Sequence, residues 1–314
     1  MNDKIKNFVS RRGFIQTGMG TLAGLLGIGL LGQGATAQEE VTTQSDTHMT
    51  GHDGTMMMMG EVNHENNGFD PLQVLTDWDY GEVSTMDNGQ ILREYTIDAG
   101  DQEIEIAPGI FFPAWTYNGR VPGPTIRCTE GDRIRIRFRN VGSHPHTIHF
   151  HGVHPFEMDG VPGAGDGDIY PGEETVLRWK ATKAGCFTYH CAPGGAMIPY
   201  HVTHGMNGAV MVLPRDGLKD AEGNALTYDS IAYIGEQDYY LPVDEFGDYK
   251  SYDSAGVDYA DSLDAMRTLT PSHSVFNGAV GALTGVNALR ANVGETVLMI
   301  HNQANRDSRP HLIG

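Results

Sequence analysis

The sequence predicts an all-β protein with two tandem Greek-key β-sandwich domains, of which the second is incomplete at its C-terminal end. Apolar and polar residues alternate with a period of two, as in residues 125–128 and 133–138, and Gly-Asp and Pro-Gly pairs separate such runs. The chain also repeats itself once. We therefore expect strands from about residue 76 onward, with one short helix near residues 262–269.

The internal repeat consists of three short motifs that recur in the same order. Their separations are 159, 163 and 165 residues, so the register drifts only slightly. The pairs are Asn118-Gly119 with Asn277-Gly278, Glu130-Gly131-Asp132 with Val293-Gly294-Glu295, and Pro145-His146 with Pro310-His311. The second copy stops at Gly314, and a β-sandwich cannot bury its core with half of its strands missing. We expect the sequence to be a piece of a longer protein.

The N-terminus resembles an export signal. Arg11-Arg12 forms a twin-arginine pattern, an apolar stretch covers residues 21–31, and Ala35-Thr36-Ala37 is a small-residue cleavage site. Residues 1–37 are therefore predicted to be a Tat signal peptide that is removed, which indicates a periplasmic or extracytoplasmic protein. No later segment is apolar and long enough to span a membrane.

Residues 38–75 are polar and lack periodicity, so we expect a flexible linker before domain 1 (residues 76–217) and domain 2 (residues 218–314). The linker is rich in Met and His, which are ligands that suit copper. Two interpretations of this Met and His content stay open: the segment captures copper, or it is a disordered linker whose composition is biased by chance.

The charge of the chain bears on its partners. The formal net charge is −19, which repels nucleic acid and anionic membranes. A small anion can still approach a locally positive metal site. A net charge this negative would also help solubility at high salt.

Three cysteines are present, Cys128, Cys186 and Cys191. An odd number in an exported protein indicates one thiol with a separate role. A disulfide between Cys128 and Cys186 is left open, because pairing depends on geometry that a sequence does not contain.

The strongest chemical signal is a Cys-x9-His-x4-Met pattern formed by Cys191, His201 and Met206 in one loop between strands. His146 comes from an earlier strand of the same domain. Two imidazoles, a thiolate and a weak axial thioether make the electron-transfer site of blue copper proteins. The alternatives are a buried core of unrelated Cys, His and Met residues, and zinc, for which a thioether is a poor ligand.

A second signal follows from the alternation of side chains along a strand. If Cys191 faces the domain interior, His190 faces outward, and if His146 faces inward, His149 and His151 share the opposite face. His151 and His190 are therefore predicted to bind a second copper ion, one residue away from the first along the chain. Histidines at a subunit contact are the alternative.

The residues from Tyr189 to Met206 resemble those of the copper nitrite reductases (NO-forming), which belong to the cupredoxin/multicopper oxidase superfamily. Three further segments, 212–220, 275–285 and 305–314, carry the same resemblance, which covers roughly residues 110–314. It implies two cupredoxin domains per chain, a homotrimer, and one-electron reduction of nitrite to nitric oxide in denitrification. Electrons would come from a small redox protein, a cupredoxin or a cytochrome c.

The resemblance also implies the roles of single residues. His146, Cys191, His201 and Met206 would hold the type 1 copper, and His151 and His190 would be two of the three ligands of the type 2 copper. The third ligand would be a His of the neighbouring subunit, at a position beyond Gly314. His311 would be the active-site histidine of the second domain, and Ile313 the apolar residue that shapes the space above the copper.

The sequence departs from this family two residues before His151. The family has an Asp there that hydrogen-bonds bound nitrite, whereas this chain has His149. His149 either replaces the Asp as the acid or binds a metal. The stretch His149-Phe150-His151 instead resembles a multicopper oxidase.

Two alternative functions follow from that departure and from the end of the chain. The first is a laccase-like two-domain oxidase that reduces O2. Such a cluster requires a His on both sides of the Cys, and here the third residue of the triplet is Ala192. The second alternative is a type 1 copper electron carrier, if the chain ends at Gly314.

Overall fold

A computed structural model describes residues 62–195 and 197–311 of the chain. The predicted signal peptide, most of the Met- and His-rich segment, and Ile313 lie outside the described residues. None of the helices within the described ranges is both long and apolar enough to cross a membrane.

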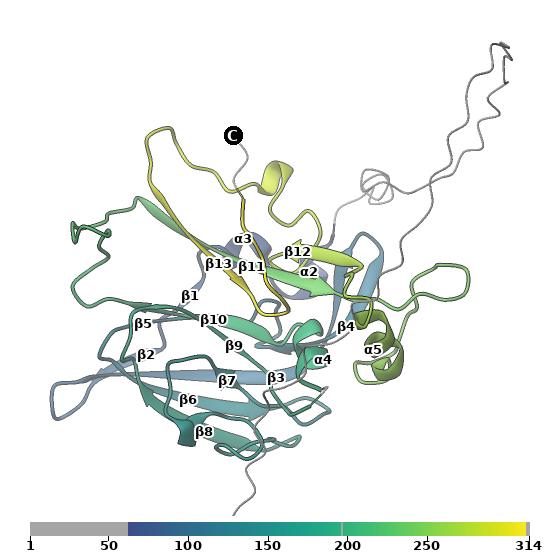
Figure 1. Cartoon of the computed structure of the whole chain (residues 1–314), viewed down its shortest axis with the longest axis horizontal. Helices are drawn as coiled ribbons and strands as arrows, with labels where there is room; N and C mark the ends of the chain where they lie inside the picture. Colours follow the sequence, from purple (N-terminus) through teal and green to yellow (C-terminus); the bar gives the residue numbers. More distant parts are fainter. Residues whose placement is uncertain (1–61, 196, 312–314) are drawn as a thin grey trace, which may run out of the picture. The chain divides into compact units, whose positions relative to one another are not determined.

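The first half of the described chain is a sandwich of two β-sheets (Figure 1). In one sheet the strands run in the order β1-β5-β10-β9-β7. These are β1 Trp78–Asp79, β5 Thr125–Thr129, β10 Asn207–Leu213, β9 Gly185–His190 and β7 His149–Phe150. The other has the order β2-β3-β6-β8, with β4 also paired to β3. These are β2 Glu82–Thr85, β3 Ile91–Ala107, β6 Arg133–Asn140, β8 Glu174–Lys180 and β4 Ile110–Tyr117.

Strand β6 shows why this sequence forms a sandwich. Its alternate residues Ile134, Ile136 and Phe138 are buried in the core, as the period-two pattern predicts. The arginines between them point outward, where Arg135 pairs with Glu94 of β3 at 2.7 Å and Arg137 pairs with Glu174 of β8 at 2.7 Å. The apolar face stabilises the sandwich, and the exposed ion pairs add little to it.

The second half repeats the local topology of the first. Strands β12 His273–Phe276, β11 Ser230–Tyr239 and β13 Val297–Gln303 form one sheet. Strand β11 is antiparallel to β12 and parallel to β13, in the same way as β3 is antiparallel to β4 and parallel to β6.

The repeated Asn-Gly motifs occupy equivalent turns in the two halves. Asn118 and Asn277 both have left-handed backbones, with φ of 53° and 48°, which asparagine tolerates better than most residues. Each side-chain oxygen accepts a hydrogen bond from the central strand of its own sheet, from the N–H of Asp98 and of Gly235 respectively. The repeat seen in the sequence is therefore a structural repeat.

Four short α-helices complete the described chain: α2 His64–Asn67, α3 Pro71–Val74, α4 Met197–Thr203 and α5 Tyr259–Met266. The 3-10 turns are η1 Phe156–Met158 and η2 Gly285–Asn287. Helix α5 begins three residues before the expected position. Helix α4 lies inside the loop that carries the Cys-x9-His-x4-Met pattern, where no helix was expected.

The segment before residue 76 differs from the expected linker over its last part. Asn67 is buried, and its side-chain amide pairs with both the N–H and the carbonyl oxygen of Glu105 in β3. Val74 and Leu75 are also buried. Four-residue helices are too short to show a period in the sequence, so this docking could not be seen there.

The two halves are joined by buried polar contacts. Gln237 of β11 accepts a hydrogen bond from Asn207 and donates to the carbonyl oxygens of Val202 and Thr203 at the end of α4. Thr188 of β9 donates to Asn302 of β13 at 2.6 Å. The second half thus holds the C-terminal end of α4.

Strand β10 separates Cys128 from Cys186. Val212 of β10 is paired with Cys128 on one side, and Met211 with Cys186 on the other. Two strand spacings amount to about 10 Å, beyond the roughly 7 Å that a disulfide can span between Cα atoms. Both thiols are free, so the open question of their pairing is answered by the register of the sheet.

Candidate metal centres

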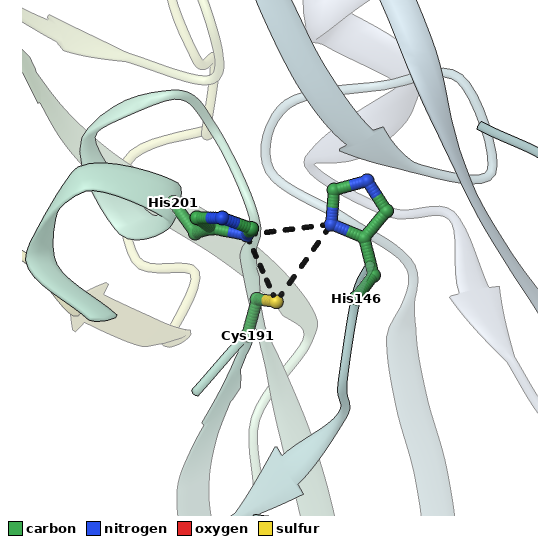
Figure 2. A group of neighbouring side chains, drawn as sticks. All are labelled: His146, Cys191 and His201. Atoms are coloured by element: carbon green, nitrogen blue, oxygen red, sulfur yellow. Dashed lines mark hydrogen bonds between the residues drawn. The ribbon is translucent and has the colours of Figure 1, made fainter. Parts of the chain in front are cut away.

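Three buried side chains converge inside the first sandwich (Figure 2). Cys191 follows the end of β9, His201 lies in α4, and His146 lies in a β-bridge with Ile169. The Sγ atom of Cys191 is 3.2 Å from Nδ1 of His201 and 3.9 Å from Nδ1 of His146, and the two Nδ1 atoms are 3.3 Å apart. The two imidazole nitrogens and the sulfur all face one point.

The surroundings of this group suit a soft cation. Burial raises the pKa of the Cys191 thiol to about 12, although hydrogen bonds from the backbone N–H and the hydroxyl of Thr147 act in the opposite direction. Burial lowers the pKa of His146 to about 4 and that of His201 to about 2. The imidazoles are therefore neutral at neutral pH, with lone pairs available, and a thiolate here needs a bound positive charge.

Met206 belongs to the same buried core cluster as Cys191. It is fully buried, its carbonyl oxygen accepts the N–H of Cys191 at 3.2 Å, and its own N–H donates to the carbonyl oxygen of His201 at 3.2 Å. These backbone bonds tie the two ends of the loop together around α4. Two imidazoles, a thiolate and an adjacent thioether form a donor set typical of type 1 copper, and they fit that metal better than zinc.

A buried network that the sequence analysis missed supports the loop. The Nε2 atom of His204 is 2.9 Å from a carboxylate oxygen of Asp258, and Tyr200 donates to the other oxygen at 2.5 Å. Burial acts to raise the pKa of Asp258, but the hydrogen bonds from His204, Ser262 and Tyr200 outweigh it and hold that pKa well below its usual range. The pattern of residues gave no signal for this pair, because the partners are 54 residues apart and belong to no motif.

A large aromatic residue, also missed, packs on the buried group. The ring of Trp115 lies 4.3 Å from that of His201 and 5.2 Å from that of His146, measured between centroids. The side chain is fully buried. It therefore restricts the orientation of both imidazoles.

A second group of histidines lies at the adjoining end of the same sheet. His149 of β7 is paired with His190 of β9, and the Nε2 atoms of His151 and His190 are 2.9 Å apart. One ligand nitrogen from each of these three residues lies within 4.8 Å of the others. His151 is exposed, and the other two are partly buried.

Two of these rings have their Nδ1 atoms occupied. Nδ1 of His190 is 2.9 Å from the carbonyl oxygen of Cys191, and Nδ1 of His149 is 2.9 Å from that of Asp159. A ring N–H donates in each case, which leaves Nε2 as the nitrogen with a lone pair. Burial lowers the pKa of His190 to about 4, and burial also lowers that of His151.

His311 is not brought together with these histidines in the described chain. It is exposed and lines a mainly apolar groove of the second half with Phe276, Met299 and His301. The expected role of Ile313 falls on a residue outside the described ranges. The family resemblance implies that His311 reaches the copper site of a neighbouring subunit, and such a contact needs a second chain.

Comparisons with known proteins agree on the kind of protein. A family model described as Multicopper oxidase matches residues 100–217. The chain is 52% identical over 239 residues to the copper-containing nitrite reductase of Rhizobium meliloti (strain 1021), covering 75% of this chain and 62% of the relative. It is 57% identical over 203 residues to the copper-containing nitrite reductase of Alcaligenes xylosoxydans xylosoxydans, covering 64% of this chain and 60% of that relative.

A solved structure described as a multicopper oxidase is similar in fold, with a TM-score of 0.55 and 37% identity, covering 70% of this chain and 65% of the other. The chain spans about three fifths of the length of the curated relatives it matches, 62% and 60% in the two cases above. The expected all-β cupredoxin fold and the copper cofactor are confirmed by these comparisons together with the strand content of the described chain.

Proposed function

We propose that this chain, which belongs to the multicopper oxidase family and within it to the copper-containing nitrite reductases, reduces nitrite by one electron to nitric oxide. The reaction consumes two protons and releases one water. The observation that carries the proposal is the placement of two neighbouring residues. Cys191 points into the buried His2Cys group, and His190 points into the outward group of imidazoles.

The buried group is the proposed electron entry site. His146, Cys191, His201 and Met206 would hold type 1 copper, and this metal supplies a one-electron redox change when it is bound. The chain contributes a dry setting with a fixed geometry. Trp115 packs on both imidazoles, and Thr147 donates a hydrogen bond to the sulfur, so that little has to move when the charge changes.

The outward group is the proposed site of nitrite. His151 and His190 would hold the type 2 copper, where a Lewis acid favours an anionic substrate despite the acidic chain. The family resemblance adds a third imidazole from a neighbouring subunit of a homotrimer, with His311 and Ile313 of that subunit lining the substrate space. His149 occupies the position of the acid that the resemblance implies.

Export and electron supply complete the proposal. The twin arginines Arg11 and Arg12 and the cleavage pattern at Ala37 favour the Tat route to the periplasm or cell exterior. A small cupredoxin or cytochrome c would deliver electrons there, as one step of denitrification. The Met- and His-rich residues 38–64 remain a hypothesis for copper capture, tested by deleting them and measuring copper loading.

Two observations bear on the laccase-like alternative. The three outward imidazoles favour it, since such oxidases surround their cluster with histidines. Against it, the residue after Cys191 is Ala192, which is buried and donates its N–H to the Thr147 hydroxyl at 2.6 Å, so this position offers no ligand. The copper electron carrier is the remaining alternative, and it predicts a blue protein without any nitrite turnover.

The test compares copper-loaded parent protein with His190→Ala in an assay of nitric oxide formation from nitrite with an artificial electron donor. We expect His190→Ala to keep the blue absorption band and to lose nitric oxide formation. Formation at the parent rate in this variant would contradict the assignment of the site. Water formation from O2 in place of nitric oxide from nitrite would support the oxidase.

A further inference from the structure

We propose that His149, His151 and His190 of a single chain form a complete three-imidazole copper site, with His149 as the third ligand. This inference rests on the proposed type 2 copper site. It departs from what the family resemblance implies, which is a third imidazole from a neighbouring subunit and an acid at position 149.

The backbone register places the three rings on one side of the sheet. His149 begins β7 and His151 directly follows the end of that strand, so the two residues are two positions apart in extended chain and point to the same face. His190 is the cross-strand partner of His149 in β9. The ring centroid of His149 lies 5.0 Å from that of His151 and 5.3 Å from that of His190, so the three imidazoles surround a common point.

The spacing of the nitrogens suits one metal ion. Imidazole nitrogens bind at about 2.0–2.1 Å from such metals, which sets neighbouring ligand nitrogens at roughly 3 Å or slightly more. The Nε2 atoms of His151 and His190 are 2.9 Å apart, and the whole group falls within 4.8 Å. Small rotations of the rings are enough to bring the three nitrogens around one ion.

The hydrogen bonds behind the rings are those expected of metal ligands. A ligating histidine usually donates its other ring N–H to a carbonyl or carboxylate, which fixes the tautomer and the ring orientation. His149 does so to the carbonyl oxygen of Asp159, whose carboxylate is 3.5 Å from the same Nδ1. His190 does so to the carbonyl oxygen of Cys191. Both rings therefore offer Nε2 to the site.

Metal binding through Nε2 would keep His149 from serving as the acid. A proton that is to be given to nitrite must lie on the nitrogen that faces the substrate. Nδ1 of His149 faces the carbonyl oxygen of Asp159, so Nε2 is the nitrogen left for the site, and a lone pair given to a metal ion cannot carry a proton. Protons for the reaction would have to come from another group.

A neighbouring group of possible ligands is less suitable. His149, His154 and Asp159 also lie within 4.8 Å of one another. The two ring nitrogens of His154, however, both face carbonyl oxygens, those of Pro155 and Phe150. Metal binding by His154 would have to break one of these contacts, so this group is the weaker candidate.

The test measures Cu(II) binding and the number of coordinated imidazole nitrogens in the protein loaded with copper alone. We compare the parent with His149→Ala, and use His154→Gln as a matched control that also contacts Asp159. In His149→Ala we expect Cu(II) affinity at the non-blue site to fall by at least about 100-fold, since even loss of a supporting partner behind a ligand costs 10–100-fold. Pulsed electron paramagnetic resonance should count three imidazoles in the parent and two in the variant.

The His154→Gln control and the blue absorption band make each outcome decisive. The blue band should persist in both variants and reports that the sandwich has folded. Three imidazoles in His149→Ala would show a partner-supplied ligand and overturn the inference, and so would an equal loss of affinity in His154→Gln. A parent that binds copper through three imidazoles without forming nitric oxide leaves this inference standing and contradicts only the proposed function.

Discussion

Nδ1 of His190 donates a hydrogen bond to the carbonyl oxygen of Cys191 at 2.9 Å, so the side chain of one residue closes back onto the backbone of the next. The two residues thereby connect the buried group and the outward group in two ways, through the peptide bond and through this hydrogen bond. The sulfur and the outward ring keep a fixed relative orientation, because both are anchored to the same stretch of backbone.

Removal of the thiolate should separate the two proposed copper sites. We expect Cys191→Ala to abolish the blue absorption while Cu(II) remains at the outward histidines, since His190 and its sheet neighbours are unchanged. Absorption and electron paramagnetic resonance spectra of the copper-loaded variants provide the check, and a blue Cys191→Ala protein would contradict the assignment.

Thr147 should stabilise the loop beyond its own packing. Its hydroxyl accepts the N–H of buried Ala192 at 2.6 Å and lies 3.8 Å from the sulfur of Cys191. Thr147→Val leaves that N–H unsatisfied, which costs about 1–3 kcal/mol of unfolding free energy. Urea denaturation measures this change in the free energy of unfolding. Thr147→Ser keeps the hydroxyl and should therefore recover most of the lost stability.

Asp258 should make the stability of the protein fall in acid. Its pKa is held below the value of about 3.9 that an aspartate has in an unfolded chain, so its contribution is complete above about pH 4 and is lost as the pH falls further toward the folded pKa. We expect Asp258→Asn to flatten the acid side of the stability profile. It should also reduce stability near neutral pH by about 3 kcal/mol, because a buried pair with His204 is broken.

Gln237 should link the second half to the blue site. Its side chain occupies the carbonyl oxygens of Val202 and Thr203, at the end of the helix that carries His201. Gln237→Leu has a similar volume but cannot donate, so the carbonyl oxygen of Thr203 loses its donor and that of Val202 keeps only the N–H of Gly205. We expect faster loss of the blue colour in the presence of a chelator, and the same result for Gln237→Glu, which keeps the shape but also lacks the donor. An unchanged rate would show that α4 holds itself in place.

The fold and most of the candidate site could be predicted from the sequence because both depend on short periods and short spacings. The alternation in β6 and the Asn-Gly repeat are local patterns, and the opposite directions of Cys191 and His190 follow from strand geometry alone. The roles of those residues stay a prediction. What could not be predicted depends on the tertiary structure. The pair of His204 with Asp258, the docking of Asn67 on β3 and the separation of Cys128 from Cys186 by β10 all join distant parts of the chain.

The hydrogen bonds of Gln237 have a consequence for the engineering of this protein. A small blue copper protein made from residues 76–217 alone would inherit a ligand loop in which the carbonyl oxygen of Thr203 had lost its donor and that of Val202 kept only the N–H of Gly205. A designer who wants the first copy to stand alone must supply a substitute donor at the end of α4, or rebuild that turn so that water can reach it.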